Sequence, residues 1–134
     1  MLYNYNISYI INLININKLK KNLTFNVFFT KKNLYFVNFL KSFNFIYKYT
    51  LIKIKNKTYI KIFLYYYKNK IICNNFKIIS SPSKNFFLSH NSLRLISKRT
   101  SSSIFIISND KGIVSHNCAL KDKKGGLVLG FFSF

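Results

Sequence analysis

The sequence predicts an α+β fold built from two small α/β subdomains, residues 1–79 and residues 80–134. Apolar residues recur at helical spacing in two early segments and alternate along several others. The composition then changes at residues 80–83, where Ser-Ser-Pro-Ser is typical of a boundary. We expect helix, strand, helix and a three-stranded sheet in the first subdomain, and a mostly β second subdomain with a short helix.

The first subdomain begins with two predicted helices separated by a strand. Ile7 to Ile14 places isoleucines on one helical face, and Asn6 is in position to cap that helix. Leu23 to Phe29 alternates as a strand buried mainly on one side. Thr30 is expected to cap the second helix, and Asn44 to end it in the left-handed conformation. The apolar face of that second helix comprises Phe36, Phe39, Leu40 and Phe43.

A β-hairpin is predicted next. One strand starts at Ile46 to Thr50 and continues through the alternating Ile52 to Lys55. The turn is expected at Asn56-Lys57, and Tyr59 to Phe63 forms the returning strand. Its alternating lysines form either a solvated face or an RNA-facing stripe. These lysines are Lys53, Lys55 and Lys61.

The chain between the hairpin and the closing segment is less regular. A turn at Lys68-Asn69-Lys70 leads to a strand over Ile71 to Ile79. Phe86 to Leu88 is expected as a short strand, and Ser92 to Ile96 as a helical turn. Ser97 to Ser103 is polar and basic with no apolar anchor, so we expect a loop that is mobile until RNA orders it.

The closing segment is the most informative part of the sequence. The apolar run Ile104 to Ile107 leads into a polar turn, Ser108 to Gly112, whose glycine permits a positive φ. Ser115 is placed to cap a helical turn. Gly125-Gly126, before the strand Leu127 to Phe132, lets the backbone approach another backbone or a sugar. Short hydroxyl and amide groups of this kind suit the shallow minor groove of RNA.

The charge requires a polyanionic partner. Lys and Arg number 22 against two acids, Asp110 and Asp122, for a formal charge of +20. Lysines that neutralise phosphates release counterions, which favours nucleic acid. The first 17 residues are uncharged but rich in asparagine, which argues against a membrane span. Phe, Tyr, Ile, Asn and Lys dominate, and their codons are mostly A and T, so we expect an AT-rich organelle gene whose product needs no targeting leader.

Catalysis and metal binding are disfavoured. Two carboxylates and the separated His90 and His116 provide no acid–base pair, and no nucleophile has a base beside it. Cys73 and Cys118 are far apart and are expected to be free thiols in a reducing compartment. His116 and Cys118 alone do not supply a tetrahedral metal site. We therefore expect no enzyme activity, cofactor or metal.

Three closing motifs, IISSPSKNFFL, IFIISNDKGIVSHNCAL and GGLVLGFF, resemble in order and spacing the C-terminal half of the universal small-subunit ribosomal protein eight family. The helix Ile7 to Ile14 and the segment LKSFNFI are similar to its N-terminal half. The resemblance implies two α/β subdomains, with the second one gripping a helical junction in the central domain of small-subunit ribosomal RNA.

The resemblance carries RNA-binding roles to matching positions. Ser108 and Gly112 match the family's RNA-contacting turn, whereas Asn109 and Asp110 replace its Thr and Ser. Phe87 stands in place of a tyrosine that approaches RNA. Two other departures are Leu127 in place of a glutamate and Ser83 in place of the glycine after Pro82. The predicted RNA-binding residues are Ser83, Lys84, Phe87, Ser108, Asn109, Asp110, Lys111, Gly112, Ser115, Lys123, Lys124, Gly125 and Gly126.

The expected function is that of a structural constituent of an organellar small ribosomal subunit, supporting its assembly and translation. The expected partners are small-subunit ribosomal RNA and neighbouring ribosomal proteins, with no small-molecule substrate and no membrane insertion. The expected location is the mitochondrial matrix, with a plastid ribosome as the alternative. A free basic RNA-binding protein or a membrane-surface protein of an organelle is the alternative function.

Overall fold

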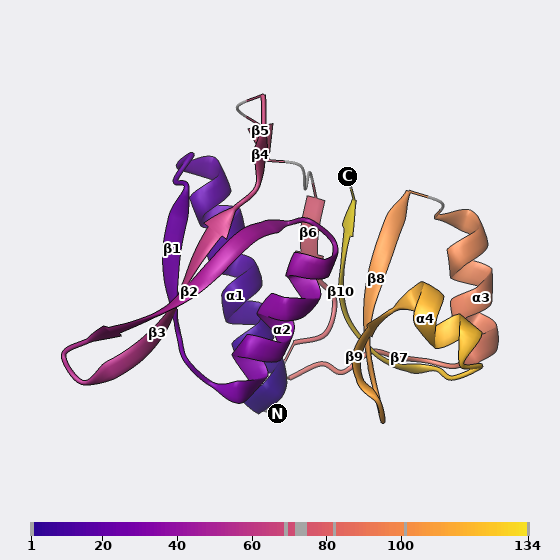
Figure 1. The fold of residues 1–134 in the computed structure, drawn as a ribbon. Coiled ribbons are helices and arrows are strands. Elements are labelled where there is room, and N and C mark those ends of the chain that lie inside the picture. Colours follow the sequence, from indigo (N-terminus) through magenta and orange to yellow (C-terminus); the bar gives the residue numbers. More distant parts are fainter. Residues whose placement is uncertain (1, 69, 72–74, 82, 101, 134) are drawn as a thin grey trace. The chain divides into compact units, whose positions relative to one another are not determined.

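A computed structural model describes residues 2–68, 70–71, 75–81, 83–100 and 102–133. The chain divides into two compact units (Figure 1). Residues 6–72 form what we call the N-terminal unit, and residues 73–134 with the first five form the C-terminal unit. Helices and antiparallel sheets confirm the predicted α+β class. The predicted domain boundary at residues 79 and 80 stays a prediction, and Pro82 beside it lies outside the described residues.

The N-terminal unit is a three-stranded antiparallel sheet with helices on one side. In order along the chain the elements are α1 (Leu2–Leu19), β1 (Thr24–Phe28), α2 (Lys31–Ser42), β2 (Ile46–Ile54), β3 (Lys57–Leu64), β4 (Tyr66–Tyr67) and β5 (Lys70–Ile71). The sheet order is β1-β3-β2, and β4 pairs only with β5 in the part described. Figure 1 shows α1 and α2 on the same side of this sheet.

The core of this unit follows the predicted periodicities. The isoleucines of α1 that share a face, Ile7, Ile10, Ile11 and Ile14, are all buried. Phe25 and Val27 of β1 pair with Ile62 and Ile60 of β3, and all of them are buried, which places them on the core face of the sheet. Helix α2 contributes Phe36, Val37 and Leu40. Burial of these apolar side chains holds together elements that are only fair helix formers by themselves.

Two predicted caps of the N-terminal unit are confirmed and one is wrong. Thr30 has extended backbone angles, and its hydroxyl oxygen accepts a hydrogen bond from Asn33 N at 3.1 Å. Asn44 has a φ of 62°, the left-handed conformation that was predicted to follow α2. Asn6 is not a cap, because α1 begins four residues earlier, at Leu2.

The predicted hairpin is present, with its turn displaced by one residue. Ile54 pairs with Lys57, so the two turn residues are Lys55 and Asn56, with φ of 47° and 63°. Two consecutive positive φ angles define a type I′ turn, whose twist matches the twist of the flanking strands. The twist of the strands therefore favours a turn made of Lys55 and Asn56 over the predicted turn of Asn56 and Lys57.

The C-terminal unit is a five-stranded antiparallel sheet with two short helices. Its elements are β6 (Asn75–Ile78), β7 (Phe87–Leu88), α3 (His90–Arg99), β8 (Ser103–Asn109), β9 (Gly112–Ser115), α4 (His116–Lys121) and β10 (Gly126–Ser133). The order is β6-β10-β8-β9, and β7 also pairs with β10. The strand expected at 71–79 is represented by β5 and β6, while residues 72–74 lie outside the described part. No described helix is long and apolar enough to cross a membrane.

The predicted loop at 97–103 is wrong at both ends, because residues 97–99 belong to α3 and Ser103 begins β8. Ser97, Lys98 and Arg99 form the last turn of α3, and Thr100 caps it by donating its hydroxyl to Ile96 O at 2.8 Å. Cations at a helix C-terminus interact favourably with the helix dipole, so the basic residues suit a helix end. Ser101 lies outside the described residues.

The two helices of this unit pack on its sheet through one apolar cluster. Leu93 of α3, Ala119 of α4, Ile107 of β8 and Val128 of β10 are buried together. Leu93, within the segment predicted as a helical turn, is the apolar anchor of the helix. A full helix forms there because it is held by this contact and by Ser89, whose hydroxyl oxygen accepts from Ser92 N at 3.3 Å.

Candidate nucleic-acid interface

The polar turn predicted at Ser108 to Gly112 is a tight two-residue turn between β8 and β9. Asn109 pairs with Gly112, which leaves Asp110 and Lys111 as the turn residues. The side-chain oxygen of Asn109 accepts a hydrogen bond from Lys111 N at 2.9 Å, which fixes the turn. Gly112 has a φ of 108°, so the predicted positive φ is confirmed.

Ser108 and Asn109 are therefore strand residues, held at the end of a paired strand rather than in a loose loop. Ser108 is half-buried and pairs with Ile113 on one side and Leu127 on the other. The amide nitrogen Nδ2 of Asn109 is buried, and no described residue accepts a hydrogen bond from it. A buried donor without an acceptor is costly, and it gives a ligand acceptor a free-energy advantage at this position.

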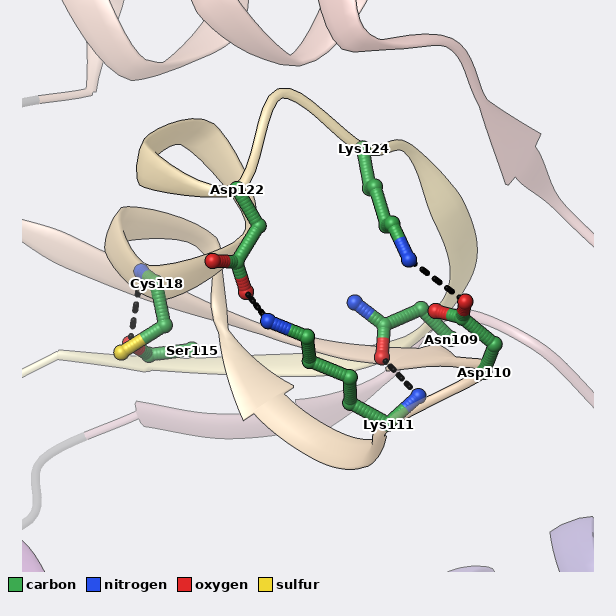
Figure 2. A network of polar contacts seen from close by, with 7 residues as sticks. All are labelled: Asn109, Asp110, Lys111, Ser115, Cys118, Asp122 and Lys124. Atoms are coloured by element: carbon green, nitrogen blue, oxygen red, sulfur yellow. Dashed lines mark hydrogen bonds and ion pairs between the residues drawn. The ribbon is translucent and has the colours of Figure 1, made fainter.

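Both acidic residues of the chain form ion pairs with lysines around this turn (Figure 2). Lys124 Nζ lies 2.5 Å from Asp110 Oδ2, and Lys111 Nζ lies 3.0 Å from Asp122 Oδ2. The hydrogen bond from Lys124, together with its charge, lowers the pKa of Asp110 below its ordinary value. The cation that offsets Asp110 is therefore Lys124, from the segment before β10, and not its chain neighbour Lys111.

The glycine pair lies against the strands β7 and β8. A Cβ added to Gly126 would be 2.5 Å from the carbonyl oxygen of Ser108 and 2.9 Å from Ile107 Cγ2. A Cβ on Gly125 would collide with the carbonyl oxygen of Leu88. The closest contact of each glycine is with a backbone carbonyl oxygen, in line with the first of the two predicted alternatives, backbone against backbone. The absence of a Cβ at the two glycines therefore allows β7, β8 and β10 to approach each other closely.

Other predicted RNA-binding residues of the C-terminal unit are exposed, in β7, in the segment before it and in the turn after α4. Phe87 pairs with Leu127 of β10 and is 68% exposed, so its ring is available for stacking. Lys84 is exposed and exchanges backbone hydrogen bonds with Ser81. Ser83 is exposed as well, with its hydroxyl 3.2 Å from that of Ser81. Lys123 is exposed and has a φ of 55°, in the turn that follows α4.

Ser115 and His116 are structural rather than surface groups. Ser115 is buried and caps α4 as predicted, accepting from Cys118 N at 3.5 Å. His116 is buried, its Nδ1 accepts from Phe105 N at 3.1 Å, and burial lowers its pKa. The thiol of Cys118 is free and exposed, whereas Cys73 lies outside the described residues. Among the described residues, no three His, Cys, Asp or Glu side chains are grouped to hold a metal.

Sequence reasoning missed two residues that support this interface. Ser80 was taken as part of a linker, yet it is buried, donates to Val128 O and accepts from Phe86 N at 3.0 Å. Asp122 was given no role, although it holds Lys111. Its position as one of only two acids in a strongly basic chain was the available signal.

The fold and this surface define a basic α+β protein that carries amide, hydroxyl, ammonium and aromatic groups on and around the strands β7, β8 and β10, the chemistry of an RNA-binding protein. The family model described as Ribosomal protein S8 matches residues 6–132, and the chain belongs to that family. A search of curated proteins found no match.

Membership in this family of structural ribosomal proteins confirms the resemblance drawn from the closing motifs. The chain is a small-subunit ribosomal protein that binds ribosomal RNA and has ribosomal proteins as neighbours. The individual RNA-contacting residues remain predictions.

Proposed function

We propose that the C-terminal unit binds a helical junction in the central domain of small-subunit ribosomal RNA, and that it acts in an organellar ribosome in the mitochondrial matrix. The first part rests on one observation above the others. The Asn109 amide donor is buried without an acceptor among the described residues, at the end of a rigid strand. An RNA acceptor that displaces the groups covering this donor would complete its hydrogen bonding.

Each group of this surface has a chemical role in this proposal. Ser108 and Asn109 contact base edges or ribose, and the exposed ring of Phe87 stacks on a base. Lys84 and Lys123 neutralise phosphates, as do Lys111 and Lys124 once a phosphate takes the place of their carboxylate partners. Such an exchange keeps each ammonium paired before and after binding, so it limits the cost of desolvation. Ser115 acts through α4, because its hydroxyl oxygen already caps that helix.

The test of the base-contacting role uses Asn109→Asp. This variant keeps the oxygen that accepts from Lys111 N and removes the Nδ2 donor. Affinity for a three-way-junction RNA should fall by about 1–3 kcal/mol, with a smaller change for a continuous duplex. Asn91→Asp adds the same charge at an exposed position of α3 and is the matched control. Equal losses in both variants, or equal losses on both RNAs, would contradict a specific contact at Asn109.

The organellar assignment rests on composition, since the enriched residues have A- and T-rich codons while the charge of +20 requires an anionic partner. Sedimentation of the native protein from separately purified mitochondria and plastids tests it. A peak that coincides with the small ribosomal subunit supports the assignment. Recovery with plastid ribosomes would move the protein to the other organelle, and recovery in a membrane fraction or a free pool would contradict the ribosomal function.

A further inference from the structure

The sheet of the N-terminal unit has a second face that the helices do not cover. Residues of β3 alternate, so the buried Ile60 and Ile62 point toward the helices while Tyr59, Lys61 and Phe63 point away. We call the side carrying these last residues the open face. Its composition differs from an ordinary solvated sheet face, because aromatic rings and ammonium groups occupy it together.

Strand pairing arranges the open face as three rows that cross the sheet. The first row is apolar, the second is polar, and the third is aromatic and basic. In order they are Phe28–Tyr59–Ile52, Asn26–Lys61–Thr50 and Thr24–Phe63–Lys48. Adjacent rows are about 6.6 Å apart, two residues along a strand.

The first row contains a ring pair that is accessible. The centroids of Phe28 and Tyr59 lie 4.9 Å apart with an interplanar angle of 33°. Phe28 is 52% exposed although it sits within a paired strand. An exposed phenylalanine ring has no hydrogen bond to make with water, so its face gains free energy when a flat ligand covers it.

The Phe63 ring of the third row holds two cations in place, Lys48 of its own row and Lys61 of the second. Lys48 Nζ lies 4.9 Å from the centroid of the Phe63 ring, and Lys61 Nζ lies 5.5 Å from it. Contact with the ring restricts both ammonium groups on this face before any ligand binds. The alternating lysines of the hairpin, which the sequence left as either a solvated face or an RNA-facing stripe, do not share one face of the sheet. Of those, only Lys61 is on the open face, since Lys53 pairs with Thr58 on the opposite face and Lys55 is in the turn.

The charge of the unit selects the ligand. Every charged residue between positions 6 and 72 is a lysine, so an acidic ligand meets no repelling carboxylate there. Ring faces, amide and hydroxyl groups and ammonium groups in successive rows match the bases, base edges and phosphates of a single strand. A duplex offers no accessible base faces to a flat sheet, because its bases are already stacked on each other.

We propose that the open face is a second RNA site, which binds single-stranded RNA by stacking a base on the Phe28–Tyr59 pair and placing phosphates at Lys48 and Lys61. The site lies in the N-terminal unit and shares no residue with the junction-binding surface of the C-terminal unit. Loss of either site therefore leaves the other testable. Asn26 and Thr50, which flank Lys61 in the row next to the ring pair, are placed to contact base edges.

The stacking step is tested with the full chain and a fluorescently labelled uridylate decamer, which has little structure of its own. Phe28→Ala should weaken binding about 5- to 150-fold, the value of one stacked base, without changing the salt dependence. Tyr35→Ala removes another exposed ring, 72% exposed on α2, and should leave the affinity within about twofold because no stacked base is lost there. Unchanged binding by Phe28→Ala, or an equal loss in Tyr35→Ala, would overturn the proposal.

The cationic step is tested by the salt dependence of the same binding. The double variant Lys48→Gln with Lys61→Gln should reduce the slope of log affinity against log salt by about 1.4, or 0.7 for each phosphate on a single strand. Lys20→Gln with Lys21→Gln removes the same charge at the exposed end of α1 and is the control. Equal reductions in the two double variants would show a diffuse field rather than a site.

The competing hypothesis is that the open face contacts another protein. Cross-linking in native small subunits distinguishes a protein contact from an RNA contact. Ultraviolet cross-links from Tyr59 or Phe28 to a nucleotide support the proposal. Cross-links from these residues only to another protein would overturn it. The proposal also fails if Phe28→Ala abolishes self-association of the chain while its binding of the decamer is unchanged.

Discussion

Asp110→Asn should increase both the affinity for RNA and the salt dependence of that affinity. The reason is that Asp110 forms an ion pair with Lys124, and a phosphate of the RNA competes for the same ammonium group. Asp110 Oδ2 lies 2.5 Å from Lys124 Nζ, and the residue is exposed, so the substitution disturbs no core packing. In the wild type a phosphate reaches Lys124 only by displacing the Asp110 carboxylate, whose freed charge then offsets that contact. In the variant the contact counts in full, which raises the slope of log affinity against log salt by about 0.9. A tenfold decrease in salt should then raise the variant's advantage over the wild type about eightfold.

The assay is anisotropy of a labelled junction RNA at several potassium chloride concentrations. The double variant Asp110→Asn with Lys124→Gln has the wild-type net charge and lacks the freed ammonium, so its slope should return to the wild-type value. Asp122→Asn makes the same change to the other pair, at Lys111. The reasoning is refuted if Asp110→Asn leaves the slope unchanged, or if the double variant keeps the gain.

Three further outcomes follow from packing, capping and protonation. Gly126→Val places a Cβ about 2.5 Å from Ser108 O and should cost about 1–3 kcal/mol, so an unchanged melting temperature would contradict the close approach. Thr30→Ala removes a helix cap and should cost about 1 kcal/mol in denaturant unfolding, whereas Thr30→Ser should cost much less. Because burial lowers the pKa of His116 from 6.5, the unfolded chain takes up its proton first and stability should fall as the pH drops below 6.5. In thermal melts across this pH range His116→Gln should flatten that decline, and an identical decline in the variant would assign it to other groups.

Local chemistry made several elements predictable. The spacing of apolar residues identified the buried faces of α1 and α2, since a helix of 3.6 residues per turn has no other way to gather them. Thr30 and Ser115 were recognisable caps because a hydroxyl can satisfy an orphan amide within three residues of chain. The helix α3 was underestimated, because its anchor Leu93 gains its free energy only from α4, β8 and β10.

The candidate site also has some features that the sequence predicts and others that it does not. The turn with Gly112 and the pair Gly125-Gly126 could be located from residue type, because few residues tolerate a positive φ or a contact as close as that with the Ser108 carbonyl. Which lysine pairs with which carboxylate could not be predicted from residue type. Lys124 rather than Lys111 holds Asp110, since pairing depends on how β10 returns beside β8.

By itself the sequence determined what depends on neighbours within a few residues: the periodic faces, the helix caps, the left-handed Asn44, and a charge that demands a polyanion. The closing motifs were enough to indicate the family that residues 6–132 match. The tertiary structure decided which groups face each other: the two ion pairs, the buried Asn109 donor, and the rows of rings and ammonium groups on the open face. These depend on strand register, and register is set by packing between segments distant in the chain.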